Sequence, residues 1–116
     1  MDEEIKNYFY YQDSFLEEND LYTLNQYLNN IDFWYDVVDK DDNRIRRQRW
    51  YHKNLQPFRK DWAEKYDRWL AFEYDDYLLN FNNLIEKRVS DILNRNVKFN
   101  SILLNYYENY NEKISP

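Results

Sequence analysis

The sequence contains no cysteine and no glycine, and it has only two prolines and one histidine among its 116 residues. Without cysteine there is no disulfide, no thiol nucleophile and no Cys-based metal site, and a cytoplasmic location is the default expectation. Without glycine the chain lacks the loops that let a backbone approach a phosphate, which argues against a P-loop or a dinucleotide fold. His52 has no second histidine beside it for a catalytic triad or a zinc motif.

Two groups of acidic residues could in principle bind a metal ion. The stretch 39–43 (DKDDN) resembles the start of a calcium loop, but the required glycine is Arg44 and the bidentate glutamate position is Trp50. Glu73 and Asp76 share one side of an expected helix, yet nothing else in the sequence converges on them. We therefore expect no enzyme, no bound metal and no cofactor.

Apolar residues make up 43% of the chain and aromatic residues 21%, which is enough for one compact core. No uninterrupted apolar stretch approaches the roughly 20 residues that span a bilayer. We expect one helical domain over residues 1–116.

Apolar side chains recur at helical spacing along most of the chain. The spacing predicts helices over 2–18, 20–31 and 98–111, and a near-continuous stripe over 58–95 with its break at Asn80–Asn83. The expected fold is therefore all-α, a small bundle of four to five helices.

Residues 33–51 allow two interpretations. Two β-prone runs flank the turn-forming stretch 39–43, which is typical of a β-hairpin. The same apolar residues also fit a helical face. Helix is narrowly favoured, and an α+β fold with one hairpin at about 33–51 stays the alternative.

Charge is segregated along the chain, whose net charge is −6. Residues 1–42 hold twelve acidic and two basic side chains, residues 43–60 hold seven basic and no acidic ones, and residues 61–116 hold ten acidic and seven basic ones. The basic segment either neutralises the acidic blocks within the fold or faces an outside polyanion. Internal neutralisation is the favoured interpretation.

A nucleic-acid interface is the alternative use of that segment, because aromatic side chains stand beside the arginines. Its candidate residues are Arg44, Arg46, Arg47, Arg49, Trp50 and Lys53.

Acidic residues interleaved with tyrosines could imitate the phosphates and bases of nucleic acid for a basic groove. In size, acidity and expected helicity the chain resembles phage-encoded inhibitors such as anti-restriction and anti-CRISPR proteins. The resemblance is compositional and transfers no site residues.

The sequence thus predicts an acidic inhibitor or adaptor that binds a larger, nucleic-acid-handling protein, with a homodimer as a further option. The expected partner-binding residues are Asp13, Glu17, Glu18, Asp20, Glu73, Asp75 and Asp76. Direct nucleic-acid binding and a self-associating structural or virion protein are the alternatives.

Overall fold

The computed structural model describes residues 14–108. The chain divides into two compact units, residues 1–32 and 33–116, which are described separately. The expectation of one domain over 1–116 stays a prediction. None of the helices in the described part of the chain is long and apolar enough to cross a membrane.

The described part of the first unit contains one helix, α2 (Glu18–Asn29). Glu18 and Asp20 lie in its first turn, where negative charge complements the helix dipole. This helix confirms the one expected over 20–31. Residues 14–17 are not helical, and the rest of the helix expected over 2–18 lies outside the described residues.

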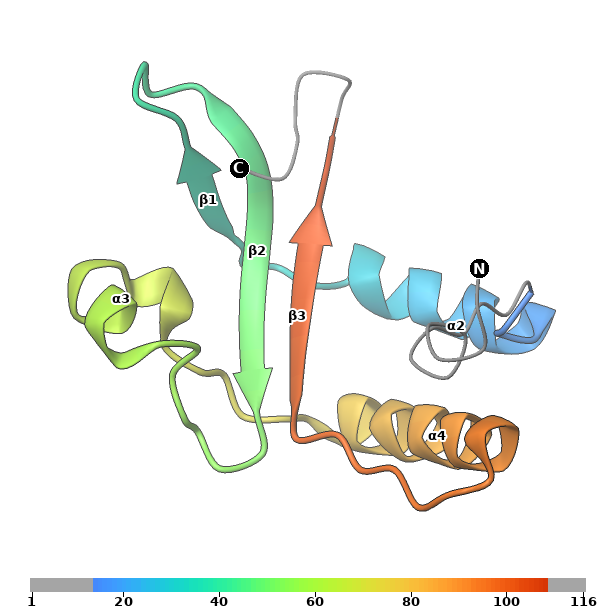
Figure 1. The fold of residues 1–116 in the computed structure, drawn as a ribbon. Coiled ribbons are helices and arrows are strands. Elements are labelled where there is room, and N and C mark those ends of the chain that lie inside the picture. Colours follow the sequence, from blue (N-terminus) through green and yellow to red (C-terminus); the bar gives the residue numbers. More distant parts are fainter. Residues whose placement is uncertain (1–13, 109–116) are drawn as a thin grey trace, which may run out of the picture. The chain divides into compact units, whose positions relative to one another are not determined.

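The second unit is built on a three-stranded antiparallel sheet (Figure 1). Its strands are β1 (Tyr35–Val38), β2 (Arg44–His52) and β3 (Ser101–Tyr106), with β2 in the centre. Tyr35 pairs with Gln48 in the first ladder, and Trp50 pairs with Leu103 in the second. The sheet therefore joins segments about fifty residues apart in the sequence.

The turn between β1 and β2 forms without glycine. The Asp39 carboxylate accepts hydrogen bonds from the backbone N–H groups of Asp41 (2.9 Å) and Asn43 (3.0 Å). Asp42 has a positive φ of 65°, a conformation that short polar side chains tolerate better than most. The acidic stretch that imitated a calcium loop is therefore a hairpin turn.

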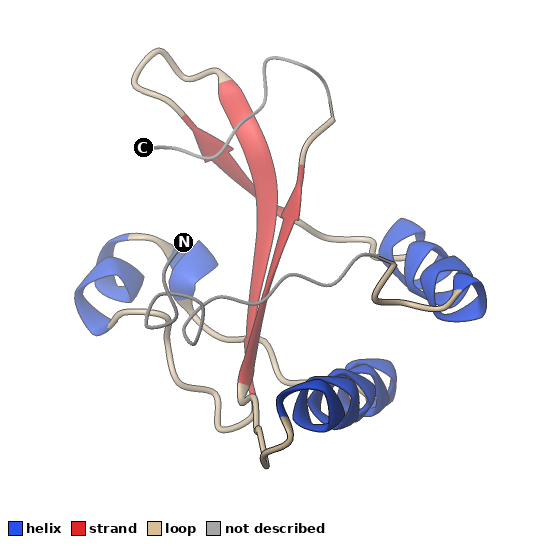
Figure 2. Ribbon diagram, turned by 45° about the vertical axis from the view of Figure 1, so that its right-hand side comes forward, coloured by secondary structure: helices blue, strands red, loops and turns tan. Residues whose placement is uncertain are grey.

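Successive β2 side chains point to opposite faces of the sheet. Each face is therefore contacted by a different helical segment. On one face, Trp50 packs on Phe58, which precedes α3 (Lys60–Lys65), and the Gln48 amide donates to the carbonyl of Arg68 in the short 3-10 helix η1 (Asp67–Trp69). On the other face, Tyr51 contacts Tyr74, just before α4 (Asp76–Leu93). Figure 2 shows α3 and α4 on either side of the strands.

The core lies within this second unit. Its buried apolar side chains come from β1, β2, η1, α4 and the segment before α4; they are Val37, Ile45, Trp50, Tyr51, Trp69, Tyr74 and Leu78. Four polar side chains are buried with them: Arg46, Gln48, Asn82 and Glu86. The core is therefore aromatic and partly polar.

The prediction of an all-α bundle of four to five helices is wrong. The protein is α+β, and residues 33–51 form the hairpin that was the alternative. Residues 101–106, expected in a helix over 98–111, form β3, because pairing with β2 supplies backbone hydrogen bonds that local spacing cannot reveal.

The expected helix over 58–95 breaks at residues 66–75 rather than at Asn80–Asn83. Phe72 is held extended against β2: its N–H donates to the Trp50 carbonyl (2.8 Å), and its carbonyl accepts from His52 N–H (3.2 Å). Asn82 stays helical because its amide has partners inside the fold. A tertiary contact, not helix propensity, thus sets the break.

Candidate functional site

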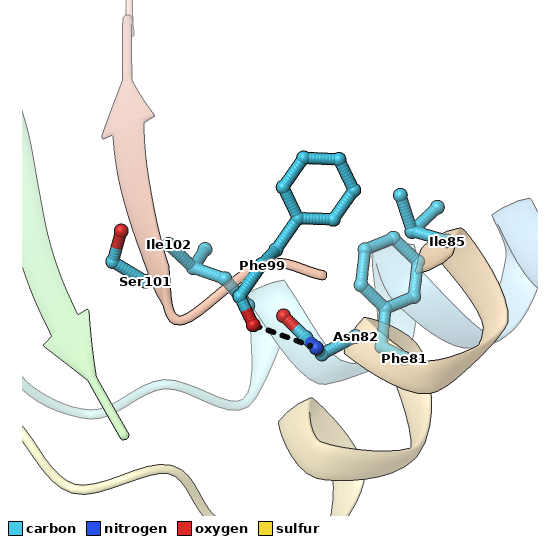
Figure 3. A pocket seen from close by; sticks show the side chains of 6 residues that line it. All are labelled: Phe81, Asn82, Ile85, Phe99, Ser101 and Ile102. Carbon is cyan, nitrogen blue, oxygen red and sulfur yellow. Dashed lines mark hydrogen bonds between the residues drawn. The ribbon is translucent and has the colours of Figure 1, made fainter. Parts of the chain in front are cut away.

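A small pocket lies between α4 and the start of β3 (Figure 3). Its volume is about 170 Å³, and its lining is mostly apolar. The lining residues are Phe81, Asn82, Ile85, Phe99, Ser101 and Ile102. The pocket can hold one apolar side chain or a small apolar molecule.

A buried carboxylate fixes the wall of this pocket. Glu86 Oε2 accepts hydrogen bonds from the Phe99 backbone N–H (2.8 Å) and from Asn82 Nδ2 (3.0 Å). Asn82 Nδ2 also donates to the Phe99 carbonyl (3.3 Å), and its Oδ1 accepts from the Tyr74 hydroxyl (3.3 Å). These bonds tie α4 to the segment that leads into β3.

Two lysines balance the charge of Glu86. Lys53 Nζ lies 3.7 Å from Oε2, and Lys98 Nζ lies 3.7 Å from Oε1. The Phe99 N–H, with smaller contributions from Asn82 and the two lysines, holds the pKa of Glu86 below its ordinary value despite the opposing effect of burial. Burial, reinforced by Glu86, raises the pKa of Tyr74 to about 12.

The hydrogen bonds of Glu86, Asn82 and Tyr74 stabilise the fold, and their protonation states are not suited to proton transfer. A carboxyl with a lowered pKa stays ionised at neutral pH, and a tyrosine with a raised pKa stays neutral. Both groups already have hydrogen-bond partners. The pocket therefore offers shape and apolar surface but no acid–base pair.

The basic residues of β2 interact largely within the fold. Arg44 and Arg47 pair with Glu108, and both lie within 4 Å of Asp36. Arg49 lies over the Phe72 ring (4.0 Å to its centre) and donates to the Tyr51 hydroxyl (2.6 Å). These contacts match the internal neutralisation expected from the charge pattern.

The remaining candidates of the basic segment are also used in the core. Arg46 is buried beside the side chain of Gln48, which accepts a hydrogen bond from it (3.4 Å). Trp50 is buried, and its indole N–H donates to the Gln56 carbonyl (3.0 Å). Trp50, the ring expected to stack on bases, is therefore covered, and Lys53 pairs with Glu86.

The predicted acidic residues are divided between the two units. Glu17, Glu18 and Asp20 lie at the start of α2, and Asp13 lies outside the described residues. Glu73, Asp75 and Asp76 lie at the start of α4, where Asp75 accepts a hydrogen bond from Leu78 N–H (2.8 Å) as the helix cap. Within each unit the acidic residues thus gather at the start of one helix.

An exposed aromatic cluster around α3 was not among the candidate residues. We define the 58–69 cluster as Phe58, Trp62, Tyr66 and Trp69. The Phe58 ring centre lies 5.7 Å from that of Trp62 and 4.7 Å from that of Trp69. Phe58, Trp62 and Tyr66 remain 43%, 38% and 52% exposed.

Two arginines frame this cluster. The Arg59 guanidinium lies over the Trp62 ring (4.9 Å) and also donates two hydrogen bonds to Asp61. Arg68 lies over the Tyr66 ring (4.5 Å). Burial, and then the nearby Arg46, lowers the pKa of Arg68. The density of Trp and Phe beside arginines was the available sequence signal, but the stripe over 58–95 was interpreted as the apolar face of a helix.

Within residues 14–108, no group of three or more His, Cys, Asp or Glu side chains is placed to hold a metal ion. No protein-family model, no curated protein and no solved structure matches the chain. The geometry of the pocket and of the 58–69 cluster is therefore the basis for the proposed function.

Proposed function

We propose that the protein is a non-enzymatic inhibitor or adaptor that binds another protein through the 58–69 cluster. The exposed rings of this cluster carry the proposal. Large aromatic side chains framed by arginine dominate the binding energy of many protein interfaces, because they bury large areas and lose little conformational freedom. Here Phe58, Trp62 and Tyr66 are all exposed on the second unit, and the Phe58 and Trp62 rings stack.

The charge around the cluster favours a protein over a nucleic acid as the partner. Residues 58–70 contain four basic and three acidic side chains, and Arg59 is already paired with Asp61. A surface that binds single-stranded nucleic acid needs a clear excess of positive charge. The internal contacts of the β2 arginines weigh against nucleic acid as well.

The acidic excess of the chain indicates a basic partner surface. The net charge is −6, and most of the excess lies in residues 1–42. Such a charge attracts the basic surface of a nucleic-acid-handling protein and speeds the encounter. In this proposal the acidic residues of 1–42 raise the association rate with the partner, and the 58–69 cluster supplies most of the binding energy.

A pull-down with matched variants tests the contact surface. Tagged wild type, W62A and Y107A are incubated with lysate of the source organism, with and without nuclease. Trp62 and Tyr107 are both 38% exposed, so the control removes a similarly accessible ring. We expect a nuclease-resistant protein that W62A loses and Y107A retains, at unchanged circular dichroism. Equal recovery with W62A, or recovery of nucleic acid instead of protein, would refute the proposal.

Charge reversal tests the choice of partner. Changing Asp13, Glu17, Glu18 and Asp20 together to lysine should slow association with the captured protein, while the far-ultraviolet spectrum keeps its wild-type shape. An association rate that is unchanged and insensitive to salt would show that the partner surface is not basic.

A further inference from the structure

Arg68 lies on the same face of the sheet as the 58–69 cluster. Gln48 and Trp50 of β2 are two residues apart, so their side chains share that face. The Gln48 amide donates to the Arg68 carbonyl (3.4 Å), and the Trp50 ring centre lies 5.1 Å from that of Phe58. Arg68 and the aromatic rings therefore belong to one layer that covers this face of β2.

The Arg68 guanidinium is partly buried without a counter-charge. Its Nε atom is buried and has no hydrogen-bond acceptor. The guanidinium contacts aromatic rings instead, and lies 4.5 Å from the centre of the Tyr66 ring and 5.5 Å from that of Trp69. Among residues 14–108, no carboxylate forms an ion pair with it. Burying part of a cation in this way is unfavourable unless an opposite charge replaces its lost hydration.

A second arginine adds positive charge at the same place. Burial and then the charge of Arg46 lower the pKa of Arg68, so the charged form of Arg68 is less favourable here than in water. Arg46 is buried on the same face of β2 and donates to the Gln48 side chain (3.4 Å). An anion bound to Arg68 would compensate for both effects.

The other arginine of the cluster has its own carboxylate. Arg59 also lies over a ring, that of Trp62 (4.9 Å), but it donates to both carboxylate oxygens of Asp61, at 2.8 and 2.9 Å. The chain thus supplies a carboxylate to Arg59, whereas the described contacts of the Arg68 guanidinium are with rings alone. This difference indicates that the counter-charge of Arg68 comes from a partner.

We propose that Arg68 binds an aspartate or glutamate side chain of the protein partner. This inference rests on the proposed function, because it names a residue that the partner places beside the 58–69 cluster. The terminal nitrogens of a guanidinium can donate two parallel hydrogen bonds to one carboxylate, and such pairs are strong and directional. The aromatic rings around Arg68 lower the exposure of the pair to water.

The local charge favours a carboxylate over a phosphate group. Residues 58–70 hold four basic and three acidic side chains, a net charge of +1. One carboxylate balances this charge, whereas a phosphate group carries about −2 at neutral pH. A partner that is otherwise basic can still provide this carboxylate, since the acidic residues that attract a basic surface lie in the other unit. The partner segment at the cluster should therefore combine one acidic residue with apolar side chains.

Peptide display tests this inference. Random peptides displayed on phage are selected on the immobilised full chain and counter-selected on W62A, so that the retained peptides depend on the 58–69 cluster. We expect these peptides to share an Asp or Glu near an aromatic or aliphatic residue. R68Q should bind them at least about tenfold more weakly than the wild type. The matched control is R59Q, which should keep near-wild-type affinity because Arg59 already has its carboxylate within the chain.

A change in the peptide gives a readout that does not depend on the folding of R68Q. Replacing the shared Asp or Glu by its amide should weaken binding to the wild type by a similar factor and have little further effect on R68Q. Peptides that need Trp62 but share no acidic residue, equal affinity for R68Q, or additive effects of the two changes would overturn the role of Arg68 alone. If no peptide depends on Trp62, the 58–69 cluster is not a binding surface and both proposals fail.

Discussion

Glu86 shows how one buried charge can organise this fold. Its carboxylate accepts from the backbone of Phe99 and from the Asn82 amide, and it lies near two lysines that come from different segments. A buried charge is tolerated when hydrogen bonds and opposite charges replace its hydration. Glu86 thus fixes how α4 meets the segment leading into β3.

Removing this carboxylate should destabilise the protein. We expect E86A to lower the free energy of unfolding by about 1–3 kcal/mol, because the Phe99 N–H and the Asn82 amide lose their acceptor. Urea denaturation followed by circular dichroism measures the loss. The control is E64A, since Glu64 is an exposed glutamate on α3. Similar midpoints for E86A and E64A would contradict this role.

The lowered pKa of Glu86 also predicts a pH dependence. A carboxyl whose pKa is lower in the folded than in the unfolded state contributes stability that is full above its unfolded pKa, here the ordinary value of 4.5. That contribution disappears as the pH falls through the lower folded pKa. The wild type should therefore lose its stability advantage over E86Q as the solution is acidified below about pH 4.5. A stability difference that stays constant between neutral pH and pH 3 would argue against it.

At the scale of elements, α4 is delimited by two local signals. Asp75 caps its N-terminus, and Asn94 ends it in the left-handed conformation with φ 52° and ψ 45°. Asparagine here replaces the glycine that commonly ends helices, and the chain has no glycine to use. The helix that supplies Asn82 and Glu86 is therefore positioned by its own end residues as well as by the core.

The cap of α4 can be tested with neighbouring aspartates. D75A should lower the free energy of unfolding by about 1 kcal/mol, because the Leu78 N–H loses its side-chain acceptor. D76A is the matched control, since Asp76 lies in the first turn and contributes mainly through the helix dipole. Thermal unfolding compares the two variants. A larger loss for D76A would mean that charge, not capping, matters at this terminus.

At the scale of the whole molecule, the described core belongs to the second unit. Every side chain of the buried apolar core lies between Val37 and Leu78, and α2 buries none of its residues. The sheet, α3 and α4 thus have a shared core within residues 33–108.

A fragment that begins at Phe33 should therefore fold by itself. We expect residues 33–116 to unfold cooperatively and to keep the near-ultraviolet signal of the buried Trp50 and Trp69. Calorimetry of the fragment and the full chain provides the comparison. Non-cooperative melting of the fragment would show that residues 1–32 are needed for the core.

Local patterns in the sequence determined the features that depend on near neighbours. The helix over 18–29 follows from apolar spacing and acidic residues in its first turn. The turn chemistry of 39–43 offered the hairpin as an alternative to a helix, and charge balance favoured internal use of the arginines without naming their partners. The absence of glycine and cysteine limited the chemistry of any site without reference to the fold.

The tertiary structure decided the features that depend on partners far along the chain. Residues 101–106 are a strand because β2 provides their hydrogen bonds, and the α-helix is broken between residues 65 and 76 because Phe72 binds the same strand. Asn82 is compatible with a helix interior because Glu86 and Phe99 satisfy its amide. The 58–69 cluster likewise depends on these pairings. Spacing along the sequence cannot reveal them, because the energy that selects them comes from contacts between segments that only folding brings together.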